Sequence, residues 1–153
     1  MYIELQDVDQ SLKVLEDDKI RLELSLGLPY SLQFYYLIYD KQNNYIGNCG
    51  IRLSDDEQYT YLGNIEYEIF EQYRGNNYAV NASNLLSKVA LFYDAKKVTI
   101  TADPSNLASN KVIQKLGARF IEVRKVPEQS ILHRTSKHVN AYEWNIESEK
   151  KIW

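Results

Sequence analysis

The segment from residue 63 to residue 93 constrains the fold more than any other part of this 153-residue chain. Residues 63–70 alternate with the period-two pattern of a strand. A basic, turn-prone loop follows, with the sequence Arg74-Gly75-Asn76-Asn77-Tyr78-Ala79. Residues 77–93 then carry one apolar stripe at helical spacing, made of Ala79, Ala82, Leu85, Leu86, Val89, Ala90 and Tyr93. We expect a strand, a loop and a long helix in direct succession.

The loop between this strand and this helix is a candidate anion site. The first turn of a helix leaves backbone N–H groups without intrahelical acceptors, and the helix dipole adds partial positive charge there. This combination suits a pyrophosphate. An ordinary loop, in which Arg74 pairs with a carboxylate, fits the same residues, so the segment alone does not decide its role.

The remaining segments complete a mixed α/β order. Residues 33–39 and 45–53, on either side of a turn at 40–44, predict a hairpin, and 54–60 predict a polar loop. Residues 98–102 form a strand continuous enough to be buried on both faces, and a helix at 107–116 ends at Gly117. Short strands are expected at 2–5, 120–124 and 141–146. In residues 8–26 the first half suits one modest helix opened by Asp9, and the second half alternates like a strand.

Composition restricts the class of protein. The length fits a single domain over residues 1–153. A net charge of −3 and a pI near 5.4 argue against general nucleic-acid binding. Cys49 is the only cysteine, so no internal disulfide forms, and we expect it to be structural. No apolar stretch approaches the ~20 residues of a membrane helix, and no signal peptide is evident. We expect a cytoplasmic monomer or homodimer.

Two motifs together resemble the GCN5-related N-acetyltransferase (GNAT) superfamily. Its fingerprint, Arg/Gln-x-x-Gly-x-Gly/Ala, is similar to the loop at 74–79, with Asn77 in place of the middle glycine. Asn is the next best residue for a left-handed backbone. Residues 103–109, Asp-Pro-Ser-Asn-Leu-Ala-Ser, and 115–118, Lys-Leu-Gly-Ala, are similar to a segment of the ribosomal-protein N-terminal acetyltransferase branch.

The resemblance implies one mixed α/β domain, with a mostly antiparallel twisted sheet of six to seven strands. That sheet would splay between strands 4 and 5 and carry helices on both faces. The resemblance also implies acetyl-CoA as co-substrate, no metal, and direct transfer of the acetyl group to an amine. The residues expected to bind the coenzyme are Ile69, Phe70, Arg74, Gly75, Asn76, Asn77, Tyr78, Ala79, Asn106 and Ser109.

The identity of the general base stays open. Relatives carry a glutamate at the position of Asn64, and an amide cannot act as a base. Glu66 and Glu68 share its strand face, and either could accept the proton directly or through water. As structural residues, both would instead be solvated or ion-paired. Backbone amides around residues 68–70 are expected to polarise the thioester carbonyl.

Protonation of the leaving thiolate is the other open step. Where many relatives have a tyrosine acid this chain has Ile113, and Ser109 is a substitute candidate. His133 and His138 are expected on the surface of the terminal loop.

Two other classes of function stay open. The departures at Asn77, Asn64 and Ile113 also fit a non-catalytic acyl-CoA-binding module. A purely structural interaction domain would bind no coenzyme at all. The acceptor stays open among a protein N-terminus, a polyamine and a small amine.

Overall fold

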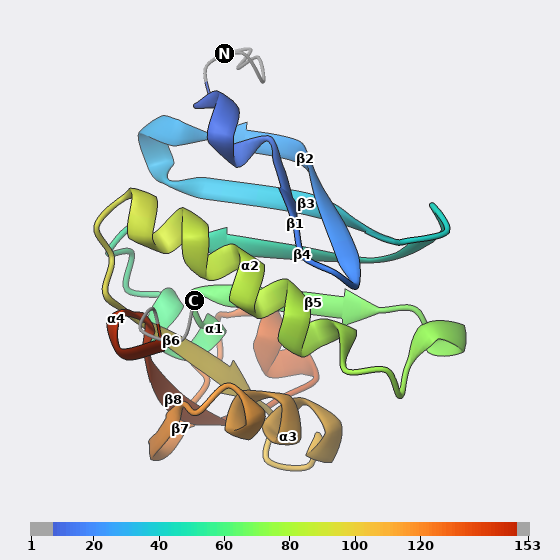
Figure 1. Ribbon diagram of the computed structural model, residues 1–153. Coiled ribbons are helices and arrows are strands. Elements are labelled where there is room, and N and C mark those ends of the chain that lie inside the picture. Colours follow the sequence, from blue (N-terminus) through green and yellow to red (C-terminus); the bar gives the residue numbers. More distant parts are fainter. Residues whose placement is uncertain (1–7, 150–153) are drawn as a thin grey trace. The chain divides into compact units, whose positions relative to one another are not determined.

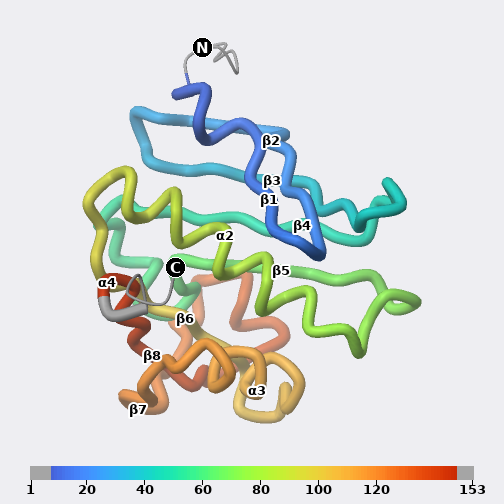
Figure 2. Tube along the Cα trace, in the orientation of Figure 1, coloured from blue at the N-terminus to red at the C-terminus, as the bar shows by residue number. Residues whose placement is uncertain are grey.

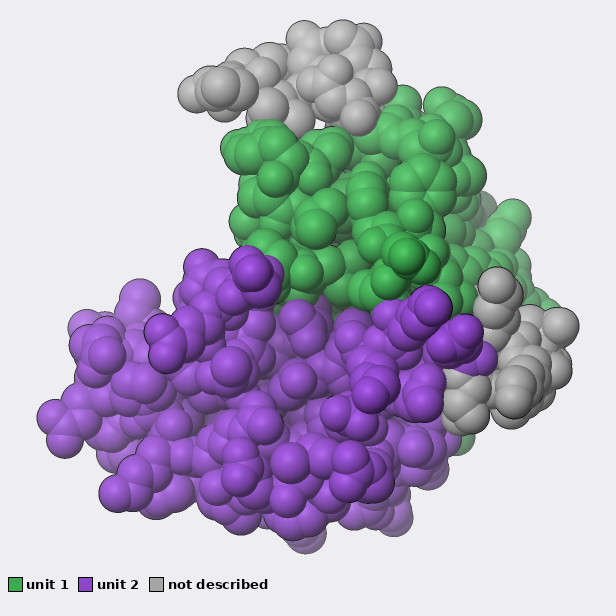
Figure 3. Space-filling model, turned by 90° about the vertical axis from the view of Figure 1, so that its left-hand side faces the viewer, with its two compact units in different colours: residues 1–54, 65–95 green, residues 55–64, 96–153 purple. Residues whose placement is uncertain are grey.

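The computed structural model describes residues 8–149, which form two compact units. Among the described residues, the first unit consists of 8–54 and 65–95, and the second of 55–64 and 96–149 (Figure 3). The strand expected at residues 2–5 lies outside the described residues. The expectation of a single domain over residues 1–153 stays a prediction.

The first unit contains a five-stranded antiparallel sheet in the order β1-β2-β3-β4-β5 (Figure 1). Its strands are β1 (Val14–Glu16), β2 (Ile20–Leu28), β3 (Gln33–Asp40), β4 (Tyr45–Arg52) and β5 (Ile65–Ile69). Three short 3₁₀ helices connect or flank these strands: η2 (Gln10–Leu12), η3 (Pro29–Ser31) and η4 (Glu71–Tyr73). The predicted hairpin of β3 and β4 is confirmed. Asp40 closes its turn, because its Oδ1 accepts 2.9 Å hydrogen bonds from the amides of Gln42 and Asn44.

The segment at residues 8–26 divides between the two expected structures. Asp9 caps a helical turn, since its Oδ1 accepts a hydrogen bond from the Ser11 amide. This turn is only η2, however, and the modest helix is replaced by strand β1, which pairs with β2. The alternating second half forms β2, as its period predicted. The connection between β1 and β2 is therefore a tight turn.

Helix α2 (Tyr78–Phe92) covers one face of the five-stranded sheet and contacts β2, β4 and β5 (Figure 1). Its buried apolar residues match the predicted stripe except Tyr93, which is half-buried: Ala79, Ala82, Leu85, Leu86, Val89 and Ala90. The sheet buries Leu22, Phe34, Tyr36, Ile38, Cys49, Ile51, Ile65 and Ile69. Because side chains alternate along a strand, burial of Ile65 and Ile69 directs Glu66 and Glu68 to the opposite, exposed face.

β4 and β5 approach each other closely at Gly47. Gly47 lies opposite Ile69 in the ladder, and a Cβ at this position would collide with the carbonyl oxygen of Glu68. The Phe70 amide extends the contact by donating a 2.9 Å hydrogen bond to Ile46. A residue without a side chain is therefore needed to hold β5 at this distance.

The second unit contains a three-stranded antiparallel sheet, in the order β6-β8-β7 (Figure 2). Its elements are α1 (Tyr59–Leu62), β6 (Lys97–Ala102), α3 (Leu107–Lys115), β7 (Arg119–Lys125), η5 (Ile131–Arg134), β8 (His138–Asn145) and α4 (Ile146–Glu149). Trp144, Val98 and Ile100 are buried in its core. None of the helices formed by residues 8–149 is long and apolar enough to cross a membrane.

The mixed α/β class is confirmed, with corrections to its details. The described residues form eight strands in two sheets, not six to seven in one, and β5 pairs with β4 whereas β6 pairs with β8. The prediction that residues 98–102 are buried on both faces is wrong, because Thr99 and Thr101 are only half-buried. The end of the expected polar loop forms α1, and the following strand starts at Ile65, two residues later than predicted.

We predict that Gly47→Ala lowers the free energy of unfolding by about 3 kcal/mol, because a methyl group would meet main-chain atoms that cannot move aside. Gly75→Ala is the matched control. Gly75 has φ +92°, but a Cβ there would meet nothing within 4 Å, so only backbone strain of about 1 kcal/mol is expected. Urea unfolding of both variants measures the difference. Equal losses would contradict the close approach at Gly47.

Candidate functional site

The loop between β5 and α2 is shaped by main-chain contacts. Arg74 Nε donates a 2.8 Å hydrogen bond to the Ile69 carbonyl, and Asn76 Nδ2 donates a 3.1 Å hydrogen bond to Tyr73. Arg74 thus braces the end of β5. No ion pair between Arg74 and a carboxylate is found among residues 8–149. The ordinary-loop alternative, which needed such a pair, loses its support.

Two residues of this loop have left-handed backbones. Gly75 has φ +92°, and Asn77, immediately before α2, has φ 62° and ψ 22°. Asn77 therefore has the left-handed backbone that the sequence allowed for at this position. Asn populates this region more readily than other residues with a Cβ, which explains how the loop tolerates the substitution.

The loop presents backbone donors to solvent. The amides of Gly75, Asn76, Tyr78 and Ala79 have no hydrogen-bond acceptor in the described part of the chain. The first helical bonds come later, from Val80 and Asn81 to the Asn77 carbonyl. Residues 74–77 are exposed, so a ligand can reach the amides of Gly75 and Asn76, whereas Tyr78 is half-buried and Ala79 is buried. This is the arrangement that the predicted anion site requires.

The turn between β1 and β2 adds a cation that the sequence did not indicate. Lys19 Nζ donates a 2.8 Å hydrogen bond to the Asn76 carbonyl and lies 5.4 Å from the centre of the Tyr78 ring. Asn81 Nδ2 donates a 3.0 Å hydrogen bond to Asp17 Oδ2 in the same turn. Lys19 is 57 residues from Asn76 in sequence. No local pattern signals this contact.

The predicted carbonyl-polarising amides at residues 68–70 are only partly available. The Phe70 amide donates to Ile46, so it cannot serve as a donor for a ligand. Because N–H groups alternate between the two edges of an antiparallel strand, the Glu68 amide also faces β4. The Ile69 amide faces the opposite edge, where its carbonyl accepts from Arg74. Ile69 is therefore the remaining candidate of the three.

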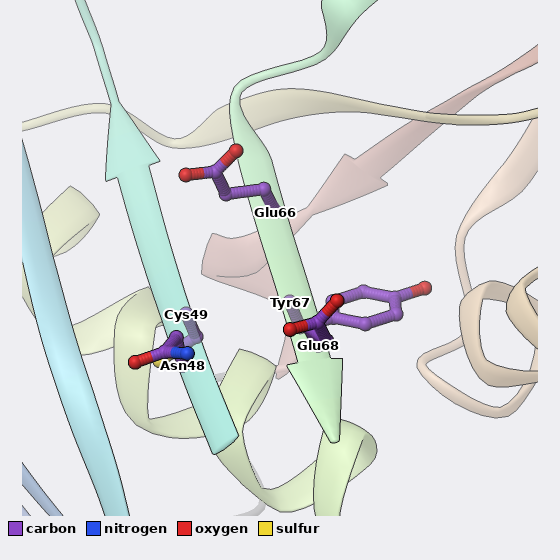
Figure 4. Close-up of a pocket in the computed structure, with 5 residues that line it drawn as sticks. All are labelled: Asn48, Cys49, Glu66, Tyr67 and Glu68. Carbon is purple, nitrogen blue, oxygen red and sulfur yellow. The ribbon is translucent and has the colours of Figure 1, made fainter. Parts of the chain in front are cut away.

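A pocket of approximately 230 Å³ lies on β4 and β5 and includes the carboxylate face of β5 (Figure 4). It is lined by Asn48, Cys49, Glu66, Tyr67 and Glu68. Both glutamates are exposed. Glu66 forms a 3.4 Å ion pair with Arg52, whereas Glu68 has no ion pair within residues 8–149. The pocket contains no basic side chain.

Cys49 lies in the wall of this pocket but is only 3% exposed. Burial, and secondarily the negative charge of Glu66, raises the pKa of its thiol well above the ordinary value. The thiolate, which is the nucleophilic form, is therefore disfavoured. This fits the structural role expected for Cys49 and opposes an acyl-cysteine intermediate.

The second unit contains Asn106 and Ser109 at the start of α3. Asn106 is the N-cap residue, because its Oδ1 accepts a 3.0 Å hydrogen bond from the Ser109 amide. Asn110 is buried and holds this turn in place. Its Nδ2 donates to the carbonyls of Asp103 and Asn106, and its Oδ1 accepts from Asn140 and from the Tyr142 hydroxyl.

The structure also shows the surroundings of Asn64, Ile113 and the two histidines. Asn64, at the family's glutamate position, exchanges two 2.7 Å hydrogen bonds with Thr99, one through its amide and one through its Oδ1. Ile113 is fully buried, so no acid faces solvent at that position. His133 is half-buried, 3.2 Å from Lys137 Nζ, and His138 is exposed.

A family model described as the acetyltransferase (GNAT) domain matches residues 7–119. The match covers most of the chain, including both motifs at 74–79 and 103–109. The chain belongs to the GNAT acetyltransferase family. Its general chemistry is therefore acetyl transfer, and the predicted resemblance is confirmed. Comparison with curated proteins gives no match.

Solved structures support the fold. RimL, a ribosomal-protein acetyltransferase solved with coenzyme A, has a TM-score of 0.69 at 15% identity, covering 88% of this chain and 99% of that one. The microcin self-immunity acetyltransferase MccE, solved with acetyl-CoA and AMP, has a TM-score of 0.60 at 21% identity, covering 76% of this chain. The aligned region spans only 62% of MccE.

A third solved structure is the Salmonella typhimurium acetyltransferase that modifies the N-terminal serine of a 50S ribosomal subunit protein. Its TM-score is 0.59 at 19% identity, over 76% of this chain and 65% of that one. At these identities, the structures establish the fold and leave the acceptor open.

We predict that Asn77→Gly keeps the affinity for acetyl-CoA within about twofold, because glycine adopts the left-handed backbone without strain. Asn77→Ala should weaken binding by up to about tenfold, since alanine pays ~1 kcal/mol or more to hold the loop in this shape. Calorimetric titration of both variants measures the effect. Equal affinities for the two variants would mean that the left-handed residue does not shape the site.

Burial of Cys49 should make its thiol slow to react in the folded protein. Iodoacetamide at pH 8 should label the folded protein at least about 100-fold more slowly than the urea-unfolded chain. Burial keeps the reagent away from the sulfur atom and disfavours the reactive thiolate form. Mass spectrometry of timed samples measures the rates. Rapid labelling of folded protein would reopen a nucleophilic role for Cys49.

Proposed function

We propose that this protein transfers the acetyl group of acetyl-CoA directly to a primary amine in a ternary complex. The observation that carries the proposal is the row of amides without acceptors from Gly75 to the start of α2, in a chain of the GNAT family. These amides would bind the pyrophosphate, with Arg74 keeping the loop in position through Ile69. Asn106 and Ser109 would contact the pantetheine arm, as the resemblance implies. The expected cytoplasmic location stays a prediction.

The transfer needs a proton acceptor for the amine and stabilisation of the thioester oxygen. The amine nitrogen attacks the carbonyl carbon, the carbon–sulfur bond breaks, and the coenzyme leaves as a thiolate. We assign polarisation of the carbonyl to the Ile69 amide. The proton lost by the amine goes to a carboxylate of β5. The thiolate takes a proton from Ser109 or from water.

Between the two candidate bases, the contacts favour Glu68. Glu66 is engaged by Arg52 in a 3.4 Å ion pair, whereas Glu68 has no ion pair within residues 8–149. Glu68 lies directly across from Asn48, and the close approach at Gly47 fixes its main chain. Its carboxylate lies on the pocket side of β5, whereas the Tyr67 ring extends away from β4 (Figure 4).

The acceptor is expected to be cationic before it reacts. The pocket is lined by two exposed carboxylates, and that of Glu68 has no ion pair within residues 8–149, so it can attract an ammonium group even though Glu66 is paired with Arg52. A protein N-terminus, a polyamine and a small primary amine all satisfy this condition. An acidic acceptor would be repelled.

A non-catalytic coenzyme-binding module is the alternative function. Two observations favour it: the hydrogen bonds that commit Asn64 to Thr99, and the burial of Ile113. Both candidates predict thermal stabilisation by acetyl-CoA. Only the enzyme releases free coenzyme A in the presence of an amine panel, which a thiol-reactive dye detects. Absence of stabilisation by acetyl-CoA or coenzyme A would overturn both.

We predict that Glu68→Gln lowers kcat by about 100-fold or more, because a general base contributes ~10²-fold or more to proton transfer. The KM for acetyl-CoA and the thermal shift it produces should stay unchanged. Glu66→Gln is the matched control, because it makes the same charge change on the same strand face. It should lower kcat by about tenfold or less. A larger loss of kcat in Glu66→Gln would identify Glu66 as the base. Full turnover of both variants would mean that neither carboxylate of β5 is the base.

A further inference from the structure

The turn between β1 and β2 places a lysine against the loop that connects β5 to α2. Asp17 Oδ1 accepts hydrogen bonds from the amides of Lys19 (2.8 Å) and Ile20 (2.9 Å), which fixes the turn. Asp17 Oδ2 accepts from Asn81 in the first turns of α2, which fixes the turn against the helix. Figure 1 shows the tip of this hairpin beside the start of α2.

Lys19 is oriented by two contacts at its end. Its ammonium donates to the Asn76 carbonyl and lies over the Tyr78 ring. An ammonium has three N–H donors, so one bond to Asn76 leaves two for a ligand. An exposed lysine held in this way loses part of its side-chain entropy before any ligand binds, which lowers the cost of binding.

We propose that Lys19 is a further phosphate-binding residue and contacts the pyrophosphate of the coenzyme. This inference rests on the proposed function, because it assigns a residue to the same site. The amides beside Asn76 supply only the partial charge of a helix end, about half an elementary charge. Lys19 adds a full positive charge at the same loop. The turn also contains two carboxylates, of which exposed Asp18 adjoins Lys19 in sequence and Asp17 is engaged by three N–H donors.

The hydrogen bond from Lys19 to Asn76 favours the pyrophosphate over the 3′-phosphate of the coenzyme as the group that Lys19 contacts. Lys19 is bonded to Asn76, which lies between Gly75 and the left-handed Asn77, within the row of amides without acceptors. A group that binds those amides therefore lies close to the ammonium. The 3′-phosphate of the coenzyme is attached to the ribose, at a distance from the pyrophosphate. Dephospho-CoA, which lacks only the 3′-phosphate, separates the two sources of negative charge.

The test is calorimetric titration of the full chain with coenzyme A and with dephospho-CoA. Lys19→Gln should raise the Kd for both by the same factor, about fivefold to tenfold, the value of one charge-assisted hydrogen bond at an exposed site. Lys19→Arg should restore most of the affinity. Raising the salt concentration from about 0.05 M to about 0.5 M should shrink the difference between wild type and Lys19→Gln, because salt screens exposed charges.

Lys41→Gln is the matched control, because Lys41 is an exposed lysine of the same unit and pairs with Glu16 at 3.3 Å. This variant has the same net charge and should bind like the wild type. An unchanged Kd in Lys19→Gln, or an equal loss in Lys41→Gln, overturns the assignment. A loss seen with coenzyme A but not with dephospho-CoA also overturns it, in favour of the 3′-phosphate. Failure of the wild type to bind any coenzyme would instead overturn the proposed function itself.

Discussion

The packing of α2 against the apolar face of the five-stranded sheet is the constraint on which the site depends. Two periodic patterns meet there: the helix places Leu85, Leu86 and Val89 on one stripe, and β5 places Ile65 and Ile69 on one face. Removing this apolar surface from water stabilises the unit by roughly 1.5–3 kcal/mol for each large side chain. The same burial forces the carboxylates of β5 outward. A slip of one residue in β5 would exchange the two faces and bury the carboxylates.

The loop at residues 74–79 has its shape from main-chain geometry more than from its side chains. Gly75 and Asn77 reverse the chain with left-handed backbones, and Arg74 is used to hold the last carbonyl of β5. The amides are left to face solvent as a result. A loop of this kind tolerates Asn in place of glycine, since what matters is the backbone conformation. This explains why a chain with a changed fingerprint keeps the expected loop.

Local patterns predicted the parts of this fold that depend on neighbours in sequence. The helical stripe, the β3–β4 hairpin and the left-handed Asn77 all follow from short-range periodicity or backbone preference. Contacts between distant segments were not predictable in this way. Lys19 reaches Asn76 only because β1 and β2 form a tight hairpin, and Asn64 is committed to Thr99 through a bridge to β6. For residues 8–26, short-range signals for a helix and a strand were both present, and pairing with the sheet decided between them.

The cap of α3 has a consequence for the choice of residue at position 106. The carboxamide oxygen of Asn106 is occupied by the Ser109 amide, which leaves the amino half of the group as the part that can donate to an acceptor outside the protein. Asp or Ser would cap the helix equally well. Neither offers a neutral N–H donor on the same side chain. An amide can thus serve the helix with one atom and donate to a carbonyl-bearing ligand with the other, whereas a serine hydroxyl would have to do both through a single oxygen.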